Sequence, residues 1–199
     1  MKSSEQQPMI KSGNPEQMVR FKNNVALVGF MGTGKTTVGR LLADKYELAF
    51  IDIDECIAKK VSMDIPTIFS RHGETFFRNL EEEILKEILT GEFQVVSCGG
   101  GIIVRESNRT LLKRNAVTCW LYNSVETSLS RISGTGRPLI NRSEPVQKAM
   151  DLYREREAYY REVASCSLCT ENLGQAQIAT MIGKEFYTNY FLNPKDLKP

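Results

Sequence analysis

A phosphate-binding pattern occupies residues 29–36, where the sequence reads GFMGTGKT. The pattern G-x-x-x-x-G-K-[ST] lets backbone N–H groups turn inward around a phosphate, and the helix that follows presents its positive end. Lys35 can reach the outer phosphates, and the Thr36 hydroxyl can bind Mg²⁺. The sequence therefore predicts a nucleotide site that uses Mg²⁺ and is built from Gly32, Thr33, Gly34, Lys35, Thr36 and Thr37.

Two aspartates close the next apolar run, LAFIDID. The alternation of this run places the side chains of Asp52 and Asp54 on the same side at the carboxyl end of a strand. Ligands of open α/β sheets bind outside the carboxyl ends of the strands, so two close carboxylates there indicate a bound cation or a polar substrate. Two helix-capping aspartates in an ordinary strand-to-helix turn would produce the same pattern.

The nucleotide site alone does not identify a reaction, because molecular switches and motors share it. A GTPase of the common kind carries D-x-x-G and N-K-x-D elements, and neither occurs in this sequence. Many ATPases place an acidic residue at the end of a later strand, but here the run ending at Cys98 continues into Gly99, Gly100 and Gly101. The acidic group that serves the nucleotide must therefore come from Asp52 or Asp54.

Strands that alternate with helices are expected to position these residues. Each of the apolar runs VALVGF, LAFIDID, FQVVSC, AVTCWLY and SLCT is followed by a helix-like segment, as in nucleotide-binding α/β domains. After the second run, Asp64 and Pro66 suit the start of one helix, which should end at Gly73. A second helix is then expected to run to about Leu89.

Length and composition favour one domain with attached segments. The 199 residues, 41% of them hydrophobic, suffice for one substantial core. We expect a flexible polar tail over 1–22, a single nucleotide-binding domain over 23–190 and a second tail over 191–199. Residues 133–145 contain two glycines, two prolines and two arginines, which predicts a mobile lid over a site.

Charge and cysteine content exclude several classes of protein. The net charge of +2 arises from 26 basic and 24 acidic residues that are interleaved, which argues against a nucleic-acid partner. No apolar run approaches the roughly 18 residues that span a membrane, and the start of the chain lacks a signal peptide, so we expect a cytoplasmic protein. The five cysteines are an odd number and are therefore expected to be free thiols.

Six motifs together resemble those of shikimate kinases. They are GFMGTGKTTVGR, FIDIDECI, IPTIF..HGETFFR..E, VVSCGGG, GRPL and REAYYREVA, in this order over about residues 25–170. The resemblance implies an α/β fold of three layers, similar to nucleoside monophosphate kinases, with a five-stranded parallel sheet and helices on both faces. It also implies a substrate-binding segment at about 54–90 and a lid. The implied reaction transfers the ATP γ-phosphoryl group to the 3-hydroxyl of shikimate, a step of aromatic amino-acid biosynthesis.

The resemblance also implies roles for individual residues. Lys35 and Thr36 would serve the phosphates and Mg²⁺, with Asp52 near the metal. Asp54 would accept hydrogen bonds from substrate hydroxyls and assist deprotonation of the attacking one. Other residues would bind the substrate or the transferred group: Arg78 and Arg156 at the carboxylate, the backbone of Gly99, Gly100 and Gly101 along the pocket, and Arg137 from the lid.

Physical chemistry supports these arginine assignments and leaves alternatives open. A planar guanidinium fork suits a carboxylate, and Glu81, one helical turn after Arg78, can hold that side chain in place. Arg154 and Arg161 share the expected helix of Arg156, and Arg131 and Arg142 flank Arg137. Two other functions remain: a P-loop kinase for a sugar acid or a nucleoside monophosphate, and a catalytically silent nucleotide-binding module. For the enzyme we expect a monomer whose partners are ATP and shikimate.

Overall fold

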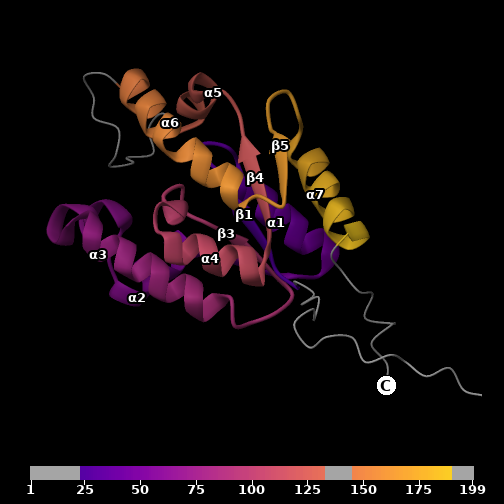
Figure 1. Ribbon diagram of the computed structural model, residues 1–199, viewed down its shortest axis with the longest axis horizontal. Coiled ribbons are helices and arrows are strands. Elements are labelled where there is room, and N and C mark those ends of the chain that lie inside the picture. The colour runs from indigo at the N-terminus through magenta and orange to yellow at the C-terminus, as the bar shows by residue number, and fades with distance from the viewer. Residues whose placement is uncertain (1–22, 133–144, 190–199) are drawn as a thin grey trace, which may run out of the picture.

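Five parallel strands form the centre of the computed structural model, which describes residues 23–132 and 145–189 (Figure 1). The strands lie in the order β2-β3-β1-β4-β5. The α/β fold with a five-stranded parallel sheet is thereby confirmed. The bounds of the strands are β1 Val25–Val28, β2 Ala49–Asp52, β3 Gln94–Ser97, β4 Val117–Tyr122 and β5 Cys166–Cys169.

Helices connect the strands, and one of them has a break. In chain order they are α1 Lys35–Tyr46, α2 Ile53–Val61, α3 Ile65–Ile88, the 3₁₀ turn η2 Ile102–Val104, α4 Glu106–Asn115, α5 Val125–Ile132, α6 Pro145–Val163 and α7 Gln175–Asn189. The expected boundary at Gly73 is confirmed as a non-helical residue (φ 78°, ψ 174°) inside α3. Of the predicted lid over 133–145, only Pro145 is among the described residues. Within these ranges, no helix has both the length and the apolarity needed to cross a bilayer.

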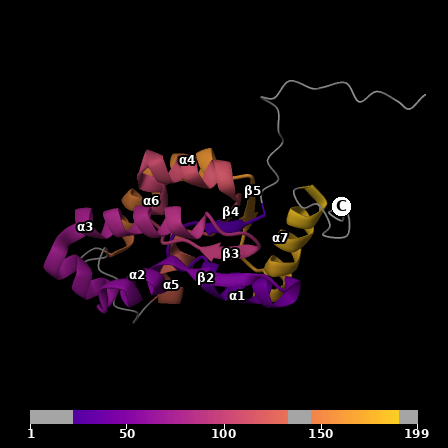
Figure 2. The same cartoon turned by 90° about the horizontal axis from the view of Figure 1, so that it is seen from below.

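Helices cover both faces of the sheet (Figure 2). The alternation of strand side chains explains this arrangement, because successive residues of β1 face opposite layers. Val25 and Leu27 pack with α1 and α7, whereas Ala26 and Val28 pack with α3, α4 and α6. The strands are therefore apolar on both faces, as expected for a buried parallel sheet.

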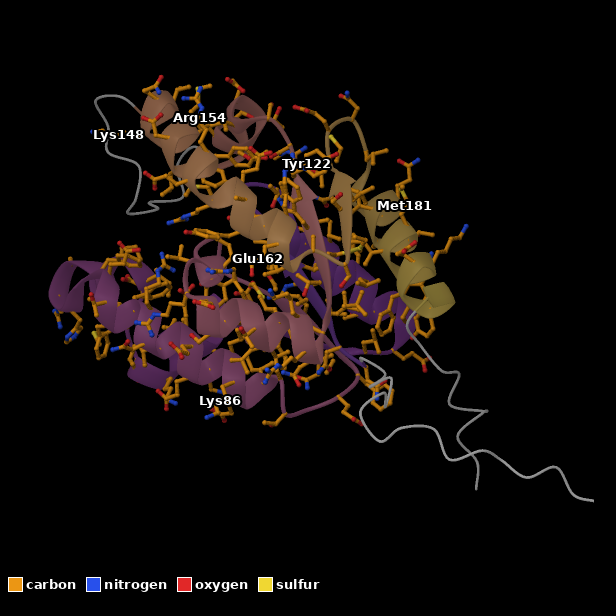
Figure 3. All side chains as sticks on the ribbon, viewed as in Figure 1. Lys86, Tyr122, Lys148, Arg154, Glu162 and Met181 are labelled. Atoms are coloured by element: carbon orange, nitrogen blue, oxygen red, sulfur yellow. A yellow bond between two sulfur atoms is a disulfide. The ribbon has the colours of Figure 1, made fainter. Side chains whose placement is uncertain are left out.

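Helix α6 is fixed to its neighbour α4 by ion pairs. Glu162, labelled on α6 in Figure 3, forms an ion pair with Arg109, whose Nε lies 2.8 Å away, and accepts a hydrogen bond from Lys113 Nζ at 2.7 Å. Arg109 is largely buried and also lies over the ring of Tyr159, 4.4 Å from its centroid. These contacts set the position of α6 beside the loop that follows β3.

Asp52 ends β2 and begins α2, which corrects the expected position of Asp54. Asp52 Oδ1 accepts from the backbone N–H of Asp54 at 3.0 Å and of Glu55 at 3.4 Å, so it caps the helix directly after the strand. Asp54 therefore lies in the first turn of α2 and not on the strand. The two carboxylates nevertheless remain at the same edge of the sheet.

A disulfide joins Cys119 to Cys166, so the prediction of five free thiols is wrong for this pair. The two residues are register partners on the neighbouring strands β4 and β5, with Cα atoms 5.0 Å apart. Residues at paired positions point their side chains to the same face, which brings the two sulfur atoms together. Cys56, Cys98 and Cys169 are free.

Candidate active site

The loop after β1 has the geometry of a phosphate cradle. Gly29, Gly32 and Gly34 have positive φ values of 145°, 77° and 93°, conformations that only glycine adopts readily. Gly34 then leads directly into α1, whose first residue is Lys35. The N-terminus of a twelve-residue helix therefore opens at the loop, with unpaired N–H groups and a partial positive charge.

Lys35 folds back over this loop. Its ammonium group donates to the carbonyl oxygens of Gly29 and Phe30, both at 2.8 Å, and lies 3.5 Å from the Thr33 hydroxyl. The residue is buried, so the loop carbonyls compensate its charge. Thr33 in turn donates to the Phe30 carbonyl at 2.8 Å, which fixes the loop, while Thr37 is exposed on the first turn of α1.

Three oxygen-bearing side chains meet beside the start of α1. The Thr36 hydroxyl donates to Asp52 Oδ2 at 2.9 Å and lies 3.4 Å from the Ser97 hydroxyl. Asp52 thus caps α2 with one oxygen and contacts Thr36 with the other, so the capping and the metal-site interpretations of this residue are compatible. Hydroxyl and carboxylate oxygens are ligands that suit Mg²⁺, and this donor set fits one ion together with phosphate oxygens.

The carboxylates of Asp54 and Glu81 flank the first residue of the glycine triplet. A Cβ atom added at Gly99 would lie 2.8 Å from Glu81 Oε1 and 2.9 Å from Asp54 Oδ1. The close approach explains why glycine, rather than a residue with a side chain, stands two positions after the end of β3. Asp54 is half-buried, whereas Glu81 has no exposed surface.

Arg78 is held by two carboxylates of its own helix. Its guanidinium donates to Glu81 Oε2 through Nη1 and to Glu74 Oε1 through Nη2 at 2.9 Å. A Cβ atom at Gly101 would overlap the guanidinium nitrogens of Arg78. The expected pairing of Arg78 with Glu81 is confirmed, and the buried guanidinium lies against the backbone of the glycine triplet.

Arg156 lies on the other side of the triplet, where Tyr160, Glu74 and Glu81 favour its charge without a carboxylate in direct contact among the described residues. It is 5% exposed, and its Nη1 donates to the Gly100 carbonyl at 3.4 Å. In residues 23–132 and 145–189, no carboxylate forms an ion pair with it. Burial lowers the pKa of the guanidinium, but arginine remains charged at neutral pH. Arg154 and Arg161 of the same helix have side chains that are 65% and 66% exposed, so only Arg156 faces the site.

The buried carboxylate of Glu81 has an unusual protonation equilibrium. Burial raises its pKa to about 7, although Arg78 opposes the shift. Its Oε2 contacts Arg78, and its Oε1 has no hydrogen-bond partner within the described parts of the chain. A buried oxygen without a partner is costly, so the local environment favours a donor or a proton at this position.

Arg137 lies outside the described residues, as does Arg142. Arg131, the other candidate for the same role, ends α5 and donates to the Gly32 carbonyl at 3.4 Å. Its side chain is therefore beside the phosphate loop.

Three residues at the site were not predicted from the sequence: Ser97, Glu81 as a member of the pocket, and Tyr160. Tyr160 is fully buried, and its hydroxyl donates to the Gly100 carbonyl at 2.5 Å. Helical spacing could have indicated two of them, because residues three or four apart lie on the same face of a helix. Glu81 follows Arg78 by three residues and Tyr160 follows Arg156 by four. Ser97 gave no such signal in the sequence.

The site can hold a nucleotide and an anionic acceptor next to each other. A phosphate cradle with an oxygen-rich group of side chains lies at the carboxyl ends of β1 and β2, and two arginines and two carboxylates surround the glycine triplet that follows β3. Phosphoryl transfer needs this combination of electrostatic stabilisation and a positioned acceptor.

The comparisons with known proteins point to one family. A family model described as "Shikimate kinase" matches residues 31–186. A shikimate kinase of Thermodesulfovibrio yellowstonii is 39% identical over 164 residues, covering 82% of this chain and 94% of the relative. A shikimate kinase of Thioalkalivibrio sulfidiphilus is 37% identical, covering 89% of this chain and 92% of the relative. The solved structure of shikimate kinase from Acinetobacter baumannii in complex with shikimate is similar with a TM-score of 0.82 at 36% identity, covering 89% of this chain and 100% of that one.

Alanine at Gly101 is expected to destabilise the unliganded protein, because its Cβ would overlap the guanidinium of Arg78. The free energy of unfolding should fall by about 1–3 kcal/mol, the usual cost of overpacking. Gly100→Ala is the matched control: the nearest atoms to its Cβ are at 3.5 Å, so a loss below about 1 kcal/mol is expected. Urea unfolding measures both changes. Equal losses in the two variants would contradict the steric explanation.

Glu81 should make the protein less stable as the pH rises from about 5 to 7. An unfolded glutamate has a pKa of about 4.3, so over this range the folded state holds a proton that the unfolded state has released. The free energy of unfolding should then fall by up to about 1.4 kcal/mol per pH unit, and Glu81→Gln should abolish this slope.

The control for this measurement is Glu82→Gln. Arg105 lowers the pKa of Glu82, so this variant should keep the wild-type slope. Urea unfolding from pH 5 to 8 compares the three proteins. If the wild type and Glu81→Gln have the same slope, Glu81 does not titrate in this range.

Proposed function

The chain belongs to the shikimate kinase family and is an ATP-dependent phosphotransferase acting on an alcohol group, and we propose that the glycine triplet and its flanking side chains form the shikimate site. In this proposal the 3-hydroxyl of shikimate is the acceptor of the γ-phosphoryl group. The observation that carries it is the buried charge of Arg156 beside Gly100, which forms no ion pair with a carboxylate among the described residues.

Arg156 supplies the main attraction for the substrate carboxylate. A buried cation without a counter-charge is unfavourable, and an incoming carboxylate removes that cost while it forms charge-assisted hydrogen bonds. Arg78 contributes differently, because Glu81 and Glu74 already hold its guanidinium. It supplies directed N–H groups at a fixed position rather than uncompensated charge.

Asp54 is the proposed partner of the attacking hydroxyl. Its carboxylate flanks Gly99 and lies in the first turn of α2, next to the carboxyl end of β2. There it accepts a hydrogen bond from the 3-hydroxyl and takes its proton. The hydroxyl oxygen forms a bond to the γ-phosphorus while the bond from that phosphorus to the bridging oxygen breaks, and ADP leaves.

The phosphate loop and the side chains near Thr36 hold the second substrate. The backbone from Gly32 to Thr37 binds the ATP phosphates, and Lys35 leaves its loop carbonyls for the outer phosphates. Thr36 and Asp52 hold Mg²⁺, which when bound neutralises phosphate charge. Ser97 lies near enough to the Thr36 hydroxyl to support its orientation.

The last residue of the proposed site is Arg137, which belongs to the expected lid. Negative charge spreads over the oxygens of the phosphoryl group during transfer, and a guanidinium brought to it stabilises that state and displaces water. Arg131, which contacts the Gly32 carbonyl, is the alternative for this role.

We also propose that the enzyme acts as a cytoplasmic monomer. The side chains proposed to bind both substrates belong to a single chain, so the proposed reaction does not require a second copy. A cytoplasmic location suits an enzyme that consumes ATP.

Arg156→Ala should raise the KM for shikimate and leave the KM for ATP nearly unchanged. The loss of a charge-assisted contact of about 1.5–3 kcal/mol corresponds to roughly a 10- to 150-fold increase in KM. Arg154→Ala is the control, because this arginine lies on the same helix but is exposed. Arg137→Ala should instead lower kcat, by roughly 100- to 1,000-fold. Steady-state kinetics with both substrates varied measures these effects, and a wild-type KM for shikimate in Arg156→Ala would refute the proposed carboxylate contact.

Asp52→Asn should increase the Mg²⁺ concentration needed for half-maximal activity by roughly 10- to 100-fold, because one charged oxygen near the metal is lost. Asp64→Asn provides the control, since Asp64 caps α3 in the same way as Asp52 caps α2. Asparagine caps helices as well as aspartate does, so both variants should remain folded. A titration of activity with Mg²⁺ tests this. The same Mg²⁺ requirement in the two variants would argue against Asp52 as a metal partner.

A further inference from the structure

Tyr160 links helix α6 to the middle residue of the glycine triplet. Its side chain has no exposed surface, and its hydroxyl donates to the Gly100 carbonyl at 2.5 Å. The ring is nearly parallel to that of Trp120, with centroids 6.0 Å apart and an interplanar angle of 12°. The tyrosine is thus fixed by packing at one end and by a hydrogen bond at the other.

The Gly100 carbonyl accepts from two donors of unequal strength. The second donor is Arg156 Nη1 at 3.4 Å, a long contact compared with the 2.5 Å bond from Tyr160. Bonds near the upper distance limit are weak. Tyr160 therefore satisfies this carbonyl, and the guanidinium of Arg156, which also interacts with the Tyr160 hydroxyl, is not needed as its donor.

We propose that Tyr160 is a positioning residue for the acceptor site, which fixes the Gly100 carbonyl and keeps the Arg156 guanidinium available to the carboxylate of the acceptor. The inference rests on the proposed role of Arg156 and adds a residue that acts through it. Tyr160 itself need not touch the substrate.

Removal of the Tyr160 hydroxyl would change the hydrogen bonds that Arg156 forms. A buried carbonyl that loses its donor is costly, and the nearest replacement is the guanidinium 3.4 Å away. Arg156 would then turn toward Gly100 and away from the acceptor. Burial also raises the pKa of the Tyr160 hydroxyl, so it remains a donor throughout the working range of pH.

The test compares Tyr160→Phe with Tyr159→Phe. Both variants lose one hydroxyl and keep the ring, but Tyr159 is exposed and lies under Arg109 on the outside of α6. For Tyr160→Phe we expect the KM for shikimate to rise by about ten-fold, as for the loss of one good hydrogen bond, with the KM for ATP unchanged. Tyr159→Phe should keep wild-type values for both substrates.

The double variant Tyr160→Phe/Arg156→Ala shows whether the effect passes through Arg156. If it does, the double variant should have the same KM for shikimate as Arg156→Ala alone. Thermal unfolding of each protein is measured alongside, because a purely structural role of Tyr160 would lower Tm without a selective change in one KM.

Different outcomes separate this inference from the proposed function. A raised KM in Arg156→Ala with a wild-type KM in Tyr160→Phe would overturn the positioning role alone. Effects that multiply in the double variant would overturn the route through Arg156. A wild-type KM in Arg156→Ala would reject the carboxylate contact itself and the inference with it.

Discussion

Glu81 has no exposed surface, and a carboxylate in that position needs a cation in direct contact. Arg78 supplies it from one turn earlier on the same helix, and this buried pair occupies space that side chains after β3 would otherwise fill. Glycine at 99 and 101 leaves room for it, since a Cβ at either position would come too close to Glu81 or to Arg78. The shape of the proposed acceptor site thus follows from the need to accommodate Glu81 and Arg78 beyond the end of a strand.

The two arginines of the pocket illustrate two ways of using a buried charge. Arg78 is compensated before any ligand arrives, so its contribution to binding is mainly geometric. Arg156 has no carboxylate in direct contact among the described residues, so part of the stability of the fold offsets the cost of keeping it buried. Functional sites often retain such unfavourable groups, because the ligand then relieves a cost that is already present.

The sequence was sufficient to predict the sheet, the phosphate loop and the break at Gly73, because glycines and alternating apolar residues mark strands and turns locally. It did not predict what depends on three-dimensional neighbours. The start of α2 at Ile53 depends on the hydrogen bond that the Asp54 backbone N–H donates to Asp52, and the Cys119–Cys166 bond depends on β5 lying next to β4. The choice of Arg156 over Arg154 came from the family motif, and burial supplies its physical reason.

The stacking of Trp120 on Tyr160 has a spectroscopic consequence. The chain has a single tryptophan, and its indole lies one aromatic ring away from the carbonyl of Gly100. The guanidinium of Arg161 lies on the indole as well, 5.1 Å from a ring centroid. Indole emission responds to nearby charges and to the orientation of adjacent rings. The tryptophan fluorescence of the protein therefore comes from a residue two contacts away from the proposed acceptor site, and we expect binding there to change it without an added label.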